Sequence, residues 1–179
     1  MPLVETGESD TPAEWMRILH DIRSSFLRSR VVCLGQPLPS GKLASPSKAV
    51  PFETLLTQAD YVLVEADGAA GHPLKAHRPF EPVIPSCTSM TVCMVGASGI
   101  GRPASLACHC PDLFCAIAGT EPDRPVRVED IARVLNQEDL ADFYLVNQID
   151  TLKDPETAVR LCGLIRKRAG ACSLYPRFR

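Results

Sequence analysis

Residues 143–169 read FYLVNQIDTLKDPETAVRLCGLIRKRA and contain the two patterns that decide the fold class. Phe143 to Asn147 is a short apolar run typical of a buried strand. Pro155 to Ala169 is predicted to form a helix, with Gly170 as its C-cap. A strand followed at once by a helix is the repeating unit of parallel α/β sheets. This stretch therefore predicts an α/β protein.

The same alternation continues on both sides of this stretch. Further elements are expected as helices at 12–28, 51–57, 111–118 and 128–135, and as strands at 30–34, 61–65, 91–96 and 172–175. The run Tyr61 to Glu65 is the clearest of these strands, and Thr11 to Glu14 has the form of a helix-starting capping box. The pattern predicts one α/β domain over residues 1–179, with a mostly parallel, doubly wound sheet.

The composition excludes several classes of protein. Hydrophobic residues make up 45% of the chain and charged residues 22%, as in ordinary globular domains. Nineteen basic and twenty-one acidic residues leave a net charge of −2, so a nucleic-acid partner is not expected. No apolar run approaches the roughly 18 residues that span a bilayer, and the polar N-terminus is unlike a secretory signal. We therefore expect a cytoplasmic protein without a membrane partner.

The eight cysteines include no C-x-x-C pair, which argues against a zinc ribbon or a thioredoxin-type redox site. In a reducing cytosol most of them are expected to be small buried residues. The exception is Cys108-His109-Cys110, where three soft ligands fall together. On a strand the two thiols would share one face, and whether they bind a metal stays open at this point.

An acidic pair follows the strand expected at 61–65. Glu65 ends this strand, and Asp67 stands two residues later, before a glycine that lets the backbone turn. Ligands of open α/β sheets bind beyond the carboxyl ends of the strands, where such acids can hold Mg²⁺ or orient a water. Glu65 and Asp67 are therefore candidate metal ligands and catalytic residues. The alternative is that they only cap the following loop.

A second polar motif, Asn147-Gln148-Ile149-Asp150, follows the strand expected at 143–147. It has the form of the N-K-x-D base-recognition element of GTP-binding proteins, with Gln148 where lysine is usual. A carboxylate can accept two parallel N–H bonds from a base, so Asn147 and Asp150 are candidate nucleotide-binding residues. The alternative is a strand-to-helix turn in which Asp150 or Thr151 caps the last helix.

The irregular segment 67–86 carries Lys75, His77 and Arg78 close together. Such a loop could clamp an anionic ligand, or it could be a solvated loop stiffened by proline. The phosphate-binding pattern G-x-x-x-x-G-K-[ST] occurs nowhere in the chain. The glycines at 35–43 and at 96–101 have the wrong spacing, so neither segment is interpreted as a phosphate cradle.

Taken together, the ordered motifs between Gly41 and Asp150 resemble the YqeC family of accessory proteins for selenium-dependent molybdenum hydroxylases. The matching stretches are Gly41-Lys42-Leu43, DYVLVEADG at 60–68, Pro73-Leu74-Lys75, EPVIP at 81–85, Gly101-Arg102-Pro103, His109 and Asn147 to Asp150. The resemblance implies a P-loop NTPase-like fold that uses ATP or GTP with Mg²⁺, and a role in selenium cofactor biosynthesis or hydroxylase maturation. It also implies that Lys75 and His109 bind an anionic group. The implied partner is the hydroxylase or one of its cofactor-synthesis proteins.

Two features depart from the family pattern. Family members start with a strand, a glycine-rich G-K-T segment and a helix, and this chain is expected to be a truncated form that begins after that unit. The residue after His109 is Cys110, where the family has arginine. The sequence thus supports two hypotheses. One is a nucleotide-dependent accessory protein, and the other is a non-catalytic partner- or cofactor-binding protein on a degenerate NTPase fold.

Overall fold

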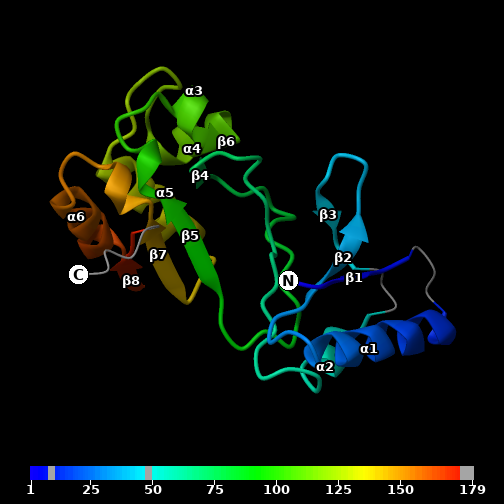
Figure 1. Ribbon diagram of the computed structural model, residues 1–179. Coiled ribbons are helices and arrows are strands. Elements are labelled where there is room, and N and C mark those ends of the chain that lie inside the picture. The colour runs from blue at the N-terminus through cyan, green and yellow to red at the C-terminus, as the bar shows by residue number, and fades with distance from the viewer. Residues whose placement is uncertain (8–10, 47–49, 174–179) are drawn as a thin grey trace. The chain divides into compact units, whose positions relative to one another are not determined.

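The computed structural model describes residues 1–7, 11–46 and 50–173, and it confirms an α/β protein with parallel strand pairs (Figure 1). The chain divides into two compact units, which we call unit 1 (Met1–Val64) and unit 2 (Glu65–Arg179). We describe each unit by itself. The single domain expected from the chain length stays a prediction.

Unit 1 combines a small sheet with two helices (Figure 1). Its elements are β1 (Leu3–Glu5), α1 (Pro12–Phe26), β2 (Cys33–Pro37), β3 (Leu43–Ala44) and α2 (Phe52–Leu55). β1 pairs with β2 in parallel, and β2 pairs with β3 in antiparallel orientation. Helix α1 starts as predicted, because the Thr11 side chain accepts a hydrogen bond from the Glu14 N–H. Ile18 and Ile22 of α1 pack into the core of the unit.

The strand expected at 61–65 is wrong. These residues form no ladder with any described residue, and the side chains of Tyr61 and Leu63 are 87% and 94% exposed. Only Val62 packs against the core of unit 1. A β-rich composition favours an extended backbone, but a strand also needs a partner that takes its hydrogen bonds. Without such a partner among the described residues, the run is an irregular connection that leads into unit 2.

Unit 2 carries most of the helices and the larger parallel sheet (Figure 1). Its strands and helices are β4 (Leu74–Lys75), β5 (Val92–Gly96), η1 (Ala97–Gly99), α3 (Ala104–Ala107), β6 (Cys108–His109), α4 (Pro111–Ala118), α5 (Val128–Glu138), β7 (Phe143–Asn147), η2 (Ile149–Thr151), α6 (Glu156–Leu164) and β8 (Arg168–Ala171). The order β5–β7–β8 is parallel throughout, and β4 pairs in parallel with β6. The strands predicted at 91–96 and 143–147 and the helices predicted at 111–118 and 128–135 are therefore confirmed.

One face of the β5–β7–β8 sheet forms the core of unit 2. Val95, Tyr144 and Val146 point into it and join buried residues of α4, α5 and α6 in one cluster. The alternate residues Val92 and Met94 are 45% and 56% exposed, so the opposite face of β5 is largely open.

The last helix is shorter than predicted. It ends at Leu164, and residues Arg168–Ala171 leave the helix to form β8 beside β7. Asn136 of α5 explains this end, because its Nδ2 donates to the Leu164 carbonyl at 2.9 Å. Its Oδ1 accepts from the Arg166 N–H at 2.8 Å. The expected C-cap at Gly170 is therefore wrong, and the part of the predicted final strand from residue 174 onward lies outside the described residues.

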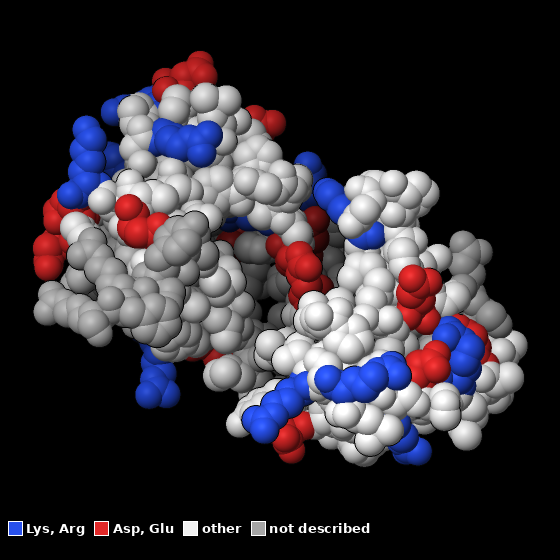
Figure 2. Space-filling model, in the orientation of Figure 1, with Lys and Arg blue, Asp and Glu red and all other residues white. Residues whose placement is uncertain are grey.

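The surface charges agree with the near-neutral composition. Figure 2 shows basic and acidic side chains of described residues interspersed on the face that it presents. Within the described ranges, no helix has the length and apolar character needed to cross a membrane.

Candidate functional site

A group of charged side chains in unit 2 brings together several residues that the sequence singled out. We call it the charge cluster, and it consists of Asp67, Lys75, His77, Glu81 and Glu138. The Lys75 Nζ lies 2.5 Å from Asp67 Oδ1 and 2.8 Å from Glu81 Oε2. It also donates to the carbonyl of Gly68 at 2.9 Å. Lys75 therefore donates hydrogen bonds to Asp67 and Gly68, whereas its contact with the buried Glu81 Oε2 is an ion pair without hydrogen-bond geometry.

Burial and pairing act on Lys75 in opposite directions. Its side chain is only 6% exposed, and desolvation lowers its pKa. The bonds to Asp67 and Glu81 outweigh this effect, so the net pKa of Lys75 is raised. Lys75 in turn lowers the pKa of Glu81. The carboxylates of Asp67 and Glu81 therefore stabilise the charged form of Lys75.

His77 connects the irregular segment to helix α5. Its Nδ1 lies 2.8 Å from Glu138 Oε2 and its Nε2 lies 3.1 Å from Asp67 Oδ2. The backbone N–H of His77 also donates to Glu138 Oε1 at 2.7 Å. The bond to Glu138 raises the pKa of His77 against the opposing effect of burial. His77 and Glu138, which are 61 positions apart in the chain, therefore join the irregular segment to α5 within the charge cluster.

This geometry bears on the acidic pair that was predicted to hold a metal. Glu65 is exposed, and each oxygen of Asp67 already faces Lys75 or His77. Within the described part of the chain, no group of three or more His, Cys, Asp or Glu residues is arranged to hold a metal ion. As arranged here, Glu65 and Asp67 do not fit a Mg²⁺ site, because a cation would have to displace Lys75 and His77. Their catalytic and metal-binding roles stay predictions.

The cysteine and histidine run at 108–110 is not a single strand. Only Cys108 and His109 belong to β6, and Cys110 turns the chain into α4 with a left-handed φ of 59°. The Cys108 thiol is buried in the core, and desolvation raises its pKa to about 12. Metals bind the thiolate form, so this burial disfavours Cys108 as a ligand. The expected alternation of the two thiols on one face is therefore wrong.

His109 lies beside Lys75 in the short ladder of β4 and β6. Its ring is 6.0 Å from the ring of His72, measured between centroids, and His72 Nδ1 lies 3.1 Å from the carbonyl of Ala69. The structure thus places Lys75 and His109 opposite each other in this ladder. The ammonium of Lys75 is already occupied, and the anion-binding role of the pair stays a prediction.

The predicted base-recognition motif lies at the carboxyl end of β7. Asn147 pairs in register with Gly96 at the end of β5. The Asn147 Oδ1 accepts the Gln148 N–H at 2.7 Å, and it lies 3.5 Å from the thiol of Cys172. The exposed Asp150 follows in η2, with its Oδ1 at 3.4 Å from the hydroxyl of Ser173. The two candidate nucleotide-binding residues therefore share one loop at the sheet edge where α/β proteins bind ligands.

Sequence reasoning missed the residues at the end of β5 and in η1 that meet this loop. The Ser98 hydroxyl donates to Gln148 Oε1 at 2.6 Å, and the Gly96 N–H donates to the Pro73 carbonyl at 2.8 Å. The sequence did carry a signal for these residues, namely the two glycines of Gly96-Ala97-Ser98-Gly99 at the end of a predicted strand. Their spacing was compared only with that of a phosphate-binding loop. Their observed role is to leave room for Pro73 and Leu74, whose atoms lie within 3 Å of where a Cβ would stand. The sequence did not indicate that Glu138 belongs to the charge cluster, because nothing in its local sequence distinguishes it from a surface helix residue.

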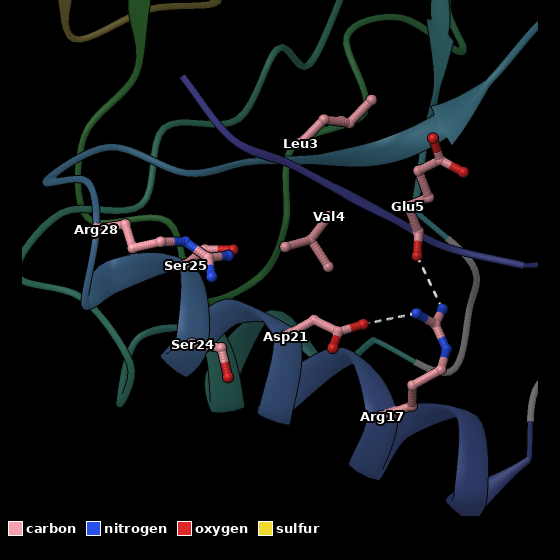
Figure 3. A pocket seen from close by; sticks show the side chains of 8 residues that line it. All are labelled: Leu3, Val4, Glu5, Arg17, Asp21, Ser24, Ser25 and Arg28. Carbon is pink, nitrogen blue, oxygen red and sulfur yellow. Dashed lines mark hydrogen bonds and ion pairs between the residues drawn. The ribbon is translucent and has the colours of Figure 1, made fainter.

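Unit 1 has a shallow cavity between β1 and α1, with a volume of about 380 Å³ (Figure 3). Arg17 is the most prominent side chain that lines it. Its guanidinium binds Asp21 at 2.7 Å and the carbonyl of Glu5 at 2.8 Å, as the dashed lines in Figure 3 show. Arg17 also pairs with Glu14, which lowers the pKa of that carboxyl to about 2. Since these groups satisfy one another, we assign no ligand to this cavity.

The fold and the strand-end loop define an α/β protein with a candidate ligand site at the carboxyl edge of a parallel sheet. The family model described as "YqeC protein" matches residues 8–112, and this chain belongs to the YqeC family. A relative from Escherichia coli (strain K12), named "Uncharacterized protein YqeC", is 32% identical over 79 residues, which are 44% of this chain. The aligned region spans 31% of that relative, or less than a third of its length. No solved structure matches the chain.

Proposed function

We propose that this protein is a nucleotide-dependent accessory protein in selenium cofactor biosynthesis or in the maturation of a selenium-dependent molybdenum hydroxylase, and that its fold is P-loop NTPase-like. The observation that carries this proposal is the placement of Asn147 and Asp150 in one loop at the carboxyl end of β7, beside the end of β5. Membership of the YqeC family supports it. Ligands of open α/β sheets bind at this edge.

In this proposal Asp150 recognises the base of ATP or GTP. Its carboxylate can accept two N–H bonds, while Asn147 holds the loop through the Gln148 N–H. Mg²⁺ would accompany the nucleotide and neutralise phosphate charge. Because Glu65 and Asp67 do not form a metal cavity as arranged here, we derive no step through that ion. Lys75 and His109 are the proposed anion-binding residues.

Isothermal titration calorimetry with ATP and with GTP, each with and without Mg²⁺, tests the proposal. We expect the wild-type chain to bind one of the two nucleotides. Asp150→Asn should weaken this binding at least about tenfold, because charge-assisted bonds to the base are lost. Asp112→Asn, which changes an exposed carboxylate in α4, is the matched control and should bind as the wild type does. Absence of binding to both nucleotides would overturn the proposal.

The second candidate is a non-catalytic protein that binds a partner or a cofactor. The closed charge cluster favours it, because Lys75 and Asp67 neutralise each other instead of facing an open ligand position. Under the first candidate, Asp150→Asn weakens nucleotide binding, because Asp150 is the proposed base-recognition residue. Under the second, the same variant still binds the hydroxylase or the cofactor-synthesis protein in a pull-down. Measuring both properties on one variant separates the two candidates.

A further inference from the structure

Gln148 has an uncommon backbone conformation at the start of the candidate base loop. Its φ is 63°, in the left-handed region that residues other than glycine rarely adopt. Its N–H donates to Asn147 Oδ1 at 2.7 Å, and its carbonyl accepts the hydroxyl of Thr151 at 2.7 Å. A strained residue of this kind persists only where its surroundings hold it. Its backbone bonds therefore tie it to both ends of the loop.

The side chain of Gln148 points back to the end of β5. Its Oε1 accepts a hydrogen bond from the Ser98 hydroxyl at 2.6 Å. A Cβ on Gly96 would stand 2.8 Å from the same oxygen, so the absence of a side chain at Gly96 leaves the space that Gln148 occupies. The segments that follow β5 and β7 are thus joined by a direct bond between side chains, in addition to the ladder of the two strands.

We propose that Ser98 and Gln148 are positioning residues, whose hydrogen bond holds the Asn147–Asp150 loop in the conformation that receives a nucleotide base. The proposal rests on the proposed function for the identity of the ligand, and on the geometry alone for the ordering of the loop. The bond with Ser98 as donor needs an acceptor at position 148, which the glutamine oxygen supplies and a lysine would not.

Ordering of the loop is measured by amide hydrogen exchange at residues 147–151 of the full chain. Ser98→Ala removes the bond and should speed exchange of these amides about 3- to 10-fold, the range expected for one neutral hydrogen bond. Ser98→Thr keeps the hydroxyl and should restore the wild-type rate. At the other side, Gln148→Leu should match Ser98→Ala, while Gln148→Glu keeps an acceptor oxygen and should match the wild type. Unchanged exchange in Ser98→Ala and Gln148→Leu would overturn the inference.

Nucleotide affinity of the same variants separates positioning from simple stabilisation. If the wild type binds a nucleotide, Ser98→Ala should weaken binding about 3- to 10-fold and Ser98→Thr should not. Faster exchange in Ser98→Ala with unchanged affinity would overturn the positioning role. If the wild type binds no nucleotide, the proposed function fails, and the exchange rates alone decide whether Ser98 and Gln148 order the loop.

Discussion

Replacing Gly96 with alanine tests how closely the end of β5, the loop after β7 and Pro73 approach one another. A Cβ at this position would lie 2.6 Å from Pro73 Cβ, 2.8 Å from Gln148 Oε1 and 2.9 Å from Pro73 Cα. Favourable carbon–carbon contacts lie at about 3.5–4.0 Å. The Pro73 Cα belongs to the backbone, so no rotamer change relieves its clash. Moving Pro73 away would also break the 2.8 Å bond from the Gly96 N–H to its carbonyl.

The expected loss of stability follows from two opposing effects. Overpacking a site of this kind costs about 1–3 kcal/mol. Alanine returns about 0.4–1 kcal/mol because it restricts the unfolded chain more than glycine does. The two ranges leave a net loss of about 0–2.6 kcal/mol, and because a backbone atom is among those that clash, we expect Gly96→Ala to lower the free energy of unfolding by about 1–2 kcal/mol. With a urea slope of about 2 kcal/mol per M, the unfolding midpoint should fall by about 0.5–1 M.

Urea unfolding followed by far-UV circular dichroism measures this shift. Gly68→Ala is a matched control in the same unit, since a Cβ there would meet no atom within 4 Å. It should leave the free energy of unfolding within about 0.5 kcal/mol of the wild-type value. A Gly96→Ala protein with a midpoint equal to or above that of the wild type would refute the close packing around Gly96.

Three further predictions concern other parts of the structure. Asn136→Ala removes both bonds that end α6, at Leu164 and Arg166, and should cost about 1–2 kcal/mol in the same urea assay; an unchanged midpoint would contradict this account of the helix end. The pKa of His77 is raised above its ordinary 6.5, so its stabilising bond to Glu138 is fully present below that pH and is lost as the pH rises through the raised value. Urea midpoints of the wild type should therefore fall toward higher pH, and those of His77→Gln should change less; equal slopes would argue against the pairing. Cys108 is buried and has a pKa of about 12, so it should react with iodoacetamide at least about tenfold more slowly than the half-buried Cys87. Mass spectrometry of the alkylated native protein measures the two rates, and equal rates would contradict the burial of Cys108.

The elements that the sequence predicted correctly depend on local signals. Helix α1 begins at a capping residue, Thr11, and helix α5 has its expected acids in the first turn, where the Asp130 carboxylate accepts the Arg127 N–H at 2.9 Å. Strands β5 and β7 are apolar runs whose alternate residues enter the core. The motif at 147–150 could be found because its residues are consecutive in the chain.

The charge cluster shows why the candidate site was predicted only in part. Sequence analysis singled out Asp67, Lys75 and His77 as separate candidates for a metal and an anion. The structure pairs them with one another and with Glu138, which the sequence did not mark. Whether a charged side chain faces a ligand or a neighbouring charge depends on the path of the backbone, and a short motif does not contain that information.

By itself the sequence determined the α/β class and most of the helix starts, because capping and hydrophobic periodicity act within a few residues. It also determined the family, because the family motifs are short runs of consecutive residues. Tertiary structure decided the rest. Tyr61 to Glu65 had the composition of a strand but no ladder partner in the part of the chain that the structure describes, and α6 ended where Asn136 took the bonds of Leu164 and Arg166. Ladders, helix ends of this kind and ion pairs all need groups that lie far apart along the chain. Only the folded backbone brings those groups together.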